Sequence, residues 1–182
     1  VKARMKKLGE EEGIIGKVKG KILSVPPEKG IEVQSWLRKV GSASREGSIL
    51  GHEKGVKDFK VPKPMGARAF EVVGIPLKEP GLYVVELESA ILGNSLLDPP
   101  RPMFVPTAVL VTNLSVHFKW GFSSSLIWVT ALDTGEPVKD AEITVKDCQE
   151  NVVWSGKTDA SGIARIEGHL PRTGRPADCG YP

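Results

Sequence analysis

Residues 126–145 read LIWVTALDTGEPVKDAEITV, and this stretch decides the fold. Leu126–Leu132 is a run of apolar and β-branched residues, and Ala141–Val145 alternates apolar residues with Glu and Thr. Asp133–Pro137 joins them, with a Gly that tolerates positive φ and a Pro that fixes φ in a tight turn. Two short strand-forming segments around such a turn predict β-strands with one face toward a core.

The rest of the second half repeats this pattern. Residues 114–120 alternate, and four apolar side chains are expected to point inward: Leu114, Val116, Phe118 and Trp120. Val152–Trp154 and Ile163–Ile166 are further strand candidates, joined by Thr158–Gly162, in which Asp159 can accept backbone hydrogen bonds. Short strands at this spacing, without a long helix, predict an antiparallel β-sandwich.

The first half contains a strand, a helix and a loop that can be recognised by pattern. Leu82–Leu92 alternates, which predicts a strand with Glu86 and Glu88 on a solvent-exposed face. Apolar residues in Ile31–Val40 follow a helical period, so we expect one short helix there. Gly41–Gly55 is rich in Gly and Ser, which predicts a mobile loop.

Three prolines in Asp98–Pro102 predict a domain boundary, because Pro lacks the N–H donor that a strand in a sheet interior needs. We therefore expect two domains, residues 1–102 and 103–182, and an all-β fold of tandem Ig-like antiparallel sandwiches. The chain begins at Val1, so we expect a piece of a longer protein whose first domain is incomplete at its start. Residues 103–182 number 80, whereas such a sandwich needs about 100 residues and seven strands. The last one or two strands are expected beyond Pro182.

The charge is unevenly distributed along the chain. Residues 1–66 carry 15 Lys and Arg against 8 Asp and Glu, whereas the remainder is acidic, and the net charge of the chain is +3. A nucleic-acid-binding domain would combine basic residues with aromatic side chains that stack on bases, but this half has only Trp36 and Phe59. We expect a solvated face and no nucleic-acid partner.

No set of residues predicts a catalytic or metal site. Ser123–Ser125 has no neighbouring His or acid, and the three histidines, His52, His117 and His169, lack metal-ligand spacing. Glu86 and Glu88 form an i, i+2 pair without a second carboxylate cluster. We therefore expect no enzyme activity, no catalytic residue, no metal and no cofactor.

The tryptophans and cysteines each allow two interpretations. The four tryptophans could line a carbohydrate platform, but three lie in the strands of one domain, which favours core packing: Trp36, Trp120, Trp128 and Trp154. The two cysteines, Cys148 and Cys179, fit either one disulfide or two buried thiols.

Several of these segments, taken together, resemble the bacterial α2-macroglobulin family. They are PGLYVVELES at 80–89, AVLVTNLSVHFK at 108–119, LIWVT at 126–130, TGEPV at 134–138, AEITV at 141–145 and TDASG at 158–162. The likeness covers about residues 68–170 and points to consecutive macroglobulin-like (MG) domains from the N-terminal half of such a protein.

The resemblance implies a function for the parent protein rather than a site in this chain. Family members are periplasmic, often lipid-anchored, broad-spectrum endopeptidase inhibitors that serve bacterial defence at the cell envelope. A protease cuts a bait region, and an internal thioester then captures it. The implied partners are other domains of the parent chain, proteases and a peptidoglycan synthase. Two alternatives stay open: a generic Ig-like surface or adhesion module, and an accessory domain of a carbohydrate-active enzyme.

The family's thioester motif, Cys-x-Glu-Gln, has a near match in Cys148–Asn151, which reads CQEN. Asn is one methylene shorter than Gln, so a ring closed on Cys148 would be smaller and more strained, and we expect no thioester. An oxidising periplasm implies instead a disulfide between Cys148 and Cys179.

Overall fold

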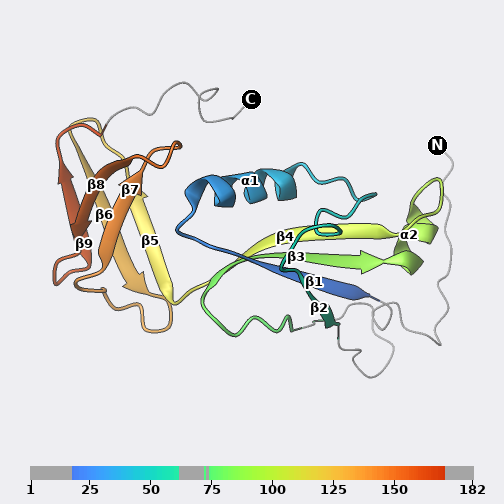
Figure 1. Cartoon of the computed structure of the whole chain (residues 1–182). Helices are drawn as coiled ribbons and strands as arrows, with labels where there is room; N and C mark the ends of the chain where they lie inside the picture. Colours follow the sequence, from blue (N-terminus) through green and yellow to red (C-terminus); the bar gives the residue numbers. More distant parts are fainter. Residues whose placement is uncertain (1–17, 62–71, 73, 171–182) are drawn as a thin grey trace, which may run out of the picture. The chain divides into compact units, whose positions relative to one another are not determined.

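The chain forms two units, Val1–Val111 and Thr112–Pro182, and the computed structural model describes residues 18–61, 72 and 74–170 (Figure 1). The elements of unit 1 are β1 (Lys19–Val25), α1 (Gly30–Gly41), β2 (Lys57–Lys60), β3 (Gly81–Ser89), α2 (Ala90–Leu96) and β4 (Met103–Val111). Its four strands form one antiparallel sheet in the order β2-β1-β3-β4.

The boundary expected near residue 103 lies instead between Val111 and Thr112. β4 pairs with β3 along its whole length, from Gly81 opposite Val111 to Ser89 opposite Met103. β4 is an edge strand, so Pro106, which cannot donate a backbone hydrogen bond, is tolerated within it. The prolines at 99–102 precede this strand and do not separate the units.

The short helix predicted at 31–40 is α1, and it covers one face of the unit 1 sheet (Figure 1). Leu23 opposite Val84 and Val25 opposite Leu82 place their side chains on the face toward the helix. Trp36 of α1 packs into this core and is 6% exposed. Burial of one helix face against apolar strand residues is the main force that holds α1 in place.

The segment 42–56, which takes in most of the mobile loop expected at Gly41–Gly55, is held against the same face of the sheet. Leu50 is 1% exposed and belongs to the core of unit 1. The carboxylate of Glu86 accepts hydrogen bonds from the Ser48 hydroxyl and from the backbone N–H of Ile49, the latter at 2.7 Å. The carbonyl of Arg45 accepts the N–H of Phe104 at 2.9 Å, so the segment also reaches β4.

The prediction that Glu86 lies on a solvent-exposed face is wrong, because Glu86 is 1% exposed. Glu88 lies on the same strand face and keeps contact with water, with an ion pair to Lys19 at 3.6 Å. The alternation along β3 is real, but the segment 42–56 covers part of the face that was expected to be wet.

Strand β3 ends earlier than the alternation predicted, because Ser89 begins a helix. Its side chain accepts the backbone N–H of Leu92 at 3.2 Å, the usual bond of an N-cap serine. Helix α2 then packs closely against the following chain. A Cβ at Gly93 would lie 2.1 Å from the carbonyl oxygen of Arg101, so only Gly fits there.

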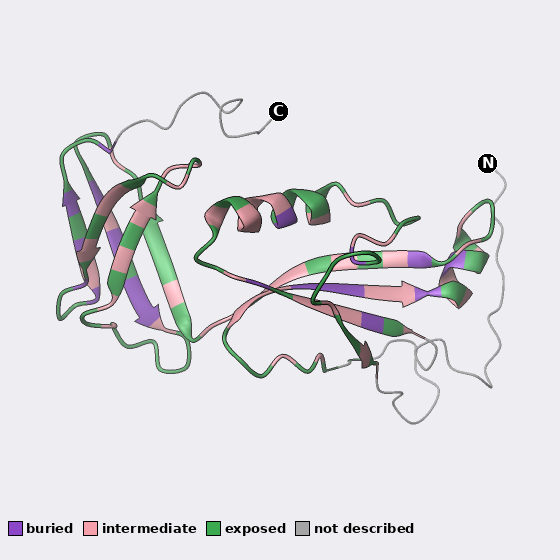
Figure 2. Cartoon of the chain, in the orientation of Figure 1, coloured by how far each residue is buried: buried purple, intermediate pink, exposed green. Residues whose placement is uncertain are grey.

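Unit 2 contains β5 (Leu114–Lys119), β6 (Ser124–Ala131), β7 (Glu142–Lys146), β8 (Val152–Lys157) and β9 (Ile163–Glu167). They form two antiparallel sheets, β5-β6-β9 and β7-β8, with a core between them (Figure 2). The most buried side chains come from β6 and β9 and from the segment after β9: Ile127, Val129, Ala164, Ile166 and Leu170. The predicted fold class, all-β with antiparallel sheets, is confirmed. The sandwich expected in the first domain is not seen in the described part of unit 1, which has one four-stranded sheet and two short helices where one was expected.

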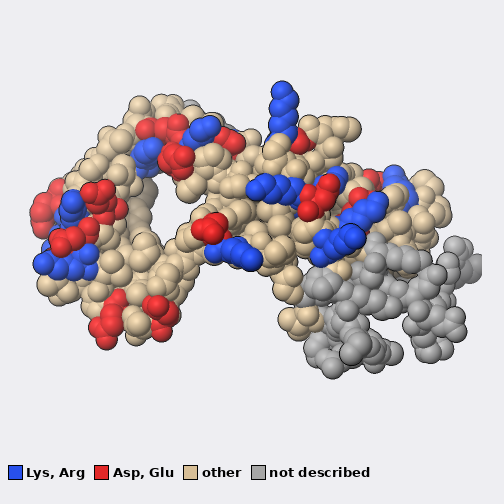
Figure 3. Space-filling view, turned by 60° about the horizontal axis from the view of Figure 1, so that its bottom comes forward, with Lys and Arg blue, Asp and Glu red and all other residues tan. Residues whose placement is uncertain are grey.

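Basic and acidic side chains are interleaved on the surface of both units (Figure 3). Several form ion pairs, including Lys39 with Glu53 at 2.9 Å, Arg101 with Glu46 at 3.0 Å and Lys157 with Glu142 at 3.1 Å. On the face drawn in Figure 3, the basic side chains of the described part of unit 1 are therefore interrupted by acidic ones.

Candidate functional site

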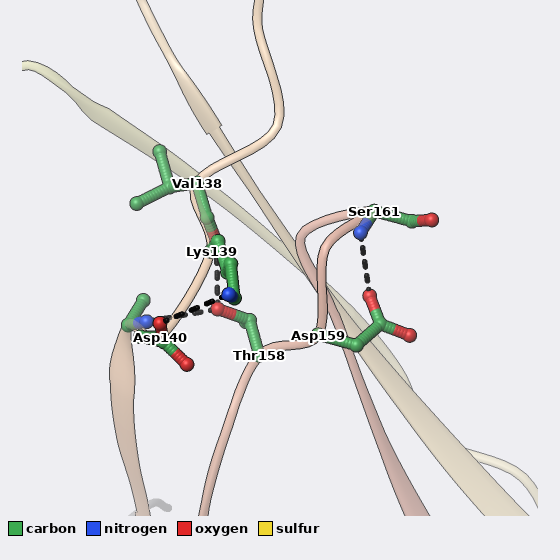
Figure 4. Close-up of polar contacts among 7 residues, drawn as sticks. Val138, Lys139, Asp140, Thr158, Asp159 and Ser161 are labelled. Atoms are coloured by element: carbon green, nitrogen blue, oxygen red, sulfur yellow. Dashed lines mark hydrogen bonds and ion pairs between the residues drawn. The ribbon is translucent and has the colours of Figure 1, made fainter.

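The turn between β8 and β9 is closed by several hydrogen bonds. The carboxylate of Asp159 accepts the backbone N–H of Ser161 at 2.8 Å (Figure 4). It also accepts the backbone N–H of Ile163 at 3.0 Å. The backbone closes the same turn, since Gly162 donates to the Asp159 carbonyl and Asp159 donates to the Ile163 carbonyl. The role predicted for Asp159, an acceptor of backbone hydrogen bonds, is confirmed.

Thr158, just before this turn, joins it to the chain between β6 and β7. Its hydroxyl donates to the Val138 carbonyl at 2.6 Å and accepts the backbone N–H of Ala141 at 2.9 Å (Figure 4). Thr158 is 3% exposed, and both of its hydrogen bonds are at least partly buried. A buried hydroxyl that satisfies one donor and one acceptor stabilises the fold and does not act as a nucleophile.

Gly162 has φ of +72°, and its position also leaves no room for a side chain. A Cβ there would lie 2.5 Å from the carbonyl oxygen of Val129. That carbonyl accepts the N–H of Val138, and the Gly162 carbonyl accepts the N–H of Val129. The turn is therefore pressed against β6, and Thr158, Asp159 and Gly162 together fix its position.

The turn between β7 and β8 repeats this geometry at the near match to the thioester motif. The Asp147 carboxylate accepts the backbone N–H groups of Gln149 and Asn151, each at 2.9 Å. Glu150, at the position of Gly162, has φ of +69°. CQEN at 148–151 is thus the body of a hairpin turn.

The side chain of Asn151 is engaged with Asp147 and not with a cysteine sulfur. Its amide Nδ2 donates to Oδ2 of Asp147 at 2.8 Å. This hydrogen bond is the main cause of the lowered pKa of Asp147. Desolvation opposes it, and the backbone N–H groups of Asn151 and Gln149 also lower the pKa. The side chain of Asn151 is therefore part of the hydrogen bonding of the turn, and the absence of a thioester stays a prediction.

The predicted disulfide falls partly outside the described residues. Cys148 directly follows Asp147 in the β7–β8 turn, whereas Cys179 lies outside the described residues. The Cys148–Cys179 disulfide therefore stays a prediction.

The serines and histidines weighed as catalytic candidates have separate local partners. Ser125 is buried, and its hydroxyl accepts the backbone N–H of Gly121 at 3.3 Å. His117 lies on the polar face of β5, where its Nε2 contacts the Ser115 hydroxyl at 3.1 Å. His169 Nδ1 contacts the Phe122 carbonyl at 2.9 Å, and His52 is exposed in unit 1. The structure does not assemble them into a nucleophile and base.

The tryptophans only partly follow the core-packing prediction. Trp36 is buried in unit 1, and Trp154 packs against the core of unit 2. Trp120 and Trp128, however, are 52% and 41% exposed, so the prediction is wrong for them. Trp128 lies on the outer face of β6 beside His117, with ring centroids 5.4 Å apart.

Glu86 with Ser48 and Ile49 is the buried polar contact that sequence reasoning missed. Ser48 is 38 residues away in sequence, and a Glu in an alternating strand is ordinarily solvated. Within the residues that the structure describes, no group of three His, Cys, Asp or Glu side chains could hold a metal ion. No helix in that part of the chain is long and apolar enough to span a membrane.

Comparison with known proteins identifies unit 2 by sequence. Residues 111–179 match the family described as the bacterial alpha-2-macroglobulin MG3 domain. The match begins where unit 1 ends, which agrees with the boundary between Val111 and Thr112. No curated protein matches the chain.

Two solved structures share the fold. A crystal structure of native alpha-2-macroglobulin from Escherichia coli spanning domains NIE-MG1 has a TM-score of 0.55 and 16% identity, over 83% of this chain and 73% of that one. A second, spanning domains MG0-NIE-MG1, has a TM-score of 0.52 and 16% identity, over 83% of this chain and 48% of that one. The sequence match over residues 111–179 agrees with both likenesses in fold: unit 2 matches the bacterial alpha-2-macroglobulin family by sequence, and the chain shares the fold of alpha-2-macroglobulin domains.

Proposed function

We propose that the chain is a structural segment of a bacterial α2-macroglobulin-like protein that traps proteases at the cell envelope. The observation that carries this proposal is the family match over residues 111–179. The signature residues of that region support a scaffold role, because Thr158, Asp159 and Gly162 all serve hydrogen bonds or close packing within the fold. Neither unit is assigned a catalytic residue or a cofactor.

In this proposal both units are macroglobulin-like domains that hold other parts of the parent apart until a protease cuts it. Their partners are the neighbouring domains of the same parent and, through the parent, proteases and a peptidoglycan synthase. The parent is periplasmic and anchored by lipid. Turns tied by buried groups such as Thr158 suit a domain that must keep its shape while its neighbours move.

A trapping assay on the parent protein tests the function. An excess of parent should suppress cleavage of a protein substrate by an endopeptidase, while cleavage of a small peptide substrate continues, because a trapped protease stays active but shielded. The chain 1–182 alone should leave both activities unchanged. Unchanged cleavage of the protein substrate by several endopeptidases would contradict the proposal.

A variant of the parent protein tests whether protease trapping depends on this segment. Thr158→Val removes the hydroxyl that ties Val138 to Ala141 and should lower the yield of trapped protease together with the thermal stability of the unit. Thr134→Val is the matched control, since that hydroxyl accepts only the neighbouring N–H of Glu136 in an exposed turn. Equal trapping by the two variants would argue against a scaffold role for unit 2.

Exposed aromatic side chains favour one second candidate, the accessory domain of a carbohydrate-active enzyme. Trp120, Trp128 and Phe122 are 52%, 41% and 79% exposed, and aromatic rings are the usual platform for sugar rings. Titration of the chain with peptidoglycan fragments and soluble glycans, followed by tryptophan fluorescence, distinguishes the two. Saturable quenching that Trp128→Ala abolishes would favour the carbohydrate module.

A further inference from the structure

The outer face of the sheet β5-β6-β9 carries an exposed tryptophan. Ile127 and Val129 point into the core of unit 2, so Trp128 between them points to the opposite face of β6. His117 of β5 and Ile163 of β9 stand opposite Trp128 and share this outer face. Trp128 is 41% exposed, and its ring centroid lies 5.4 Å from that of His117. The sheet thus presents an aromatic side chain to solvent, between two neighbours that hold it in place.

The next row of the same face is basic. Leu126 lies two residues before Trp128, and its cross-strand partners are Lys119 of β5 and Arg165 of β9. Both are exposed, and neither forms an ion pair with another residue in the described ranges 18–61, 72 and 74–170. Two cations therefore face solvent on either side of Leu126, on strands that are about 10 Å apart.

The open part of this face is limited at both ends. Thr130, the next residue of β6 on the outer side, is 8% exposed and forms a β-bridge with Pro137. Glu167, two residues after Arg165, stands opposite Ser124 and adds a negative charge at the other end. One aromatic row and one basic row lie between these ends. We call them together the Trp128 platform: His117, Trp128, Ile163, Lys119, Leu126 and Arg165.

We propose that the Trp128 platform binds an extended peptide segment in which an acidic residue stands two positions from an apolar one. Alternate side chains of an extended peptide project to one side about 6.8 Å apart, which is also the distance between the two rows. The apolar side chain packs on Trp128, and the carboxylate lies between Lys119 and Arg165, whose long side chains converge on it. The proposal goes beyond the proposed function and does not depend on it.

Charge and size favour a short acidic segment over other occupants. Two cations without an acidic partner among the described residues select an anion, and Glu167 disfavours a longer run of acids. Three strands and two rows measure about 14 Å by 7 Å. That area is far below the roughly 800 Å² that each partner contributes to a stable interface between folded proteins. A second copy of the chain would bring one basic row against another, and a neutral glycan would leave both cations unused.

NMR titration of the chain 1–182 with a synthetic peptide tests the platform. The peptide reads Ser-Thr-Phe-Thr-Glu-Ser, with both ends capped to remove their charges, and the matched peptide has Lys in place of Glu. The acidic peptide should shift the indole N–H signal of Trp128 and the amides of the platform, with a Kd on the order of 1 mM. Added salt should weaken this binding, since both cations are exposed. The Lys peptide should shift none of these signals.

A pair of charge reversals locates the binding. Lys119→Glu should weaken binding of the acidic peptide by roughly tenfold, because a repulsive group replaces one of the two cations. Lys139→Glu is the matched control: it makes the same change at an exposed residue outside the platform and should leave the Kd unchanged. Trp128→Ala should remove the contact of the Phe side chain and raise the Kd at least fivefold. The melting temperatures of the three variants show that each stays folded.

Several results would overturn the proposal. They are equal binding of the two peptides, equal effects of Lys119→Glu and Lys139→Glu, and no shift at millimolar concentrations of the acidic peptide. Tighter binding of a neutral oligosaccharide at Trp128 would overturn it in favour of a carbohydrate site. Platform signals that shift with protein concentration alone would overturn it in favour of a second copy. Neither peptide requires the parent or a protease, so a failed titration leaves the proposed function as it stands.

Discussion

The carboxylate of Glu86 accepts the backbone N–H of Ile49 at 2.7 Å, across 37 residues of sequence. Its second oxygen accepts the Ser48 hydroxyl, and Glu86 is 1% exposed. A buried carboxylate is tolerated only when its oxygens find donors, and here both do. The contact fixes the segment 42–56 on the sheet and with it Leu50, which completes the core under α1.

Replacing Glu86 with Ala should reduce the free energy of unfolding of the chain by about 2–4 kcal/mol, because Ser48 and Ile49 lose their acceptor and a cavity remains. The amide proton of Ile49 should also exchange faster with solvent. Urea denaturation and hydrogen exchange measure the two effects.

Glu88→Ala is the control for Glu86. Its side chain is partly solvated and forms one ion pair with Lys19, so the loss should be about 0–1 kcal/mol. Equal losses for the two variants would show that Glu86 does not hold the segment 42–56.

Asp147 should make unit 2 sensitive to acid. Its pKa in the folded protein lies below the ordinary value of 3.8, so its stabilising effect is complete above that value and is lost as the pH falls through the folded pKa. Asn151→Ala removes the largest cause and should move the pKa of Asp147 up toward 3.8. NMR titration of the Asp147 carboxyl measures this pKa in the two proteins.

Gln149→Ala is the matched control, because Gln149 acts on Asp147 through its backbone N–H, which the substitution keeps. The pKa of Asp147 should therefore not change in this variant. An Asn151→Ala protein in which the pKa also stays where it was would mean that the side-chain amide has no part in the shift.

Glu150→Gly should stabilise the β7–β8 turn by about 0.5–1 kcal/mol, because a residue with a Cβ is strained at positive φ and Gly is not. Glu150 has φ of +69°, and Gly occupies the same position in the β8–β9 turn. Gln149→Gly, one residue earlier, should destabilise the turn. Thermal unfolding of both variants provides the comparison, and a loss of stability in Glu150→Gly would refute the strain argument.

A disulfide between Cys148 and Cys179 should be present in protein made in an oxidising compartment. A closed loop of this length stabilises a fold by about 3–4 kcal/mol in the chain-entropy model. Mass spectrometry of the non-reduced protein should give one cross-linked peptide, and reduction should lower the denaturation midpoint. Two thiols that both react with a maleimide in the native protein would exclude the bond.

The sequence correctly predicted those features that depend on interactions between residues close together in the chain. The apolar period of residues 31–40 predicted α1, and the segment with Asp159 and Gly162 predicted a turn. The carboxylate of Asp159 and the positive φ of Gly162 act within five residues of the chain, so a short pattern is enough to reveal them. The boundary near residue 103 was wrong because the tolerance of Pro106 depends on β4 being an edge strand, which only the sheet order determines.

Whether Glu86 and Trp128 are buried depends on which other segments pack against their strands. Alternation correctly separated the two faces of each strand, but it cannot show what lies on them. Glu86 is covered by the segment 42–56, while the outer face of β6 leaves Trp128 exposed. Both outcomes result from tertiary packing, so no signal within either strand could have revealed them.

Gly162→Ala and Gly135→Ala separate backbone strain from close packing. Both glycines have positive φ, +72° and +74°, so each substitution brings the same strain of about 1 kcal/mol. A Cβ at Gly162 also meets the Val129 carbonyl at 2.5 Å, whereas a Cβ at Gly135 meets nothing within 4 Å.

The clash falls on backbone that already carries hydrogen bonds, since the Val129 carbonyl accepts the N–H of Val138. Gly162→Ala must therefore shift the turn or β6 and should cost about 1–3 kcal/mol more than Gly135→Ala in urea denaturation. Hydrogen exchange should show the extra loss at the amides of Val129 and Val138, which the turn holds in place. Equal costs for the two variants would mean that Gly162 is required for its φ alone, and that the β8–β9 turn is not pressed against β6.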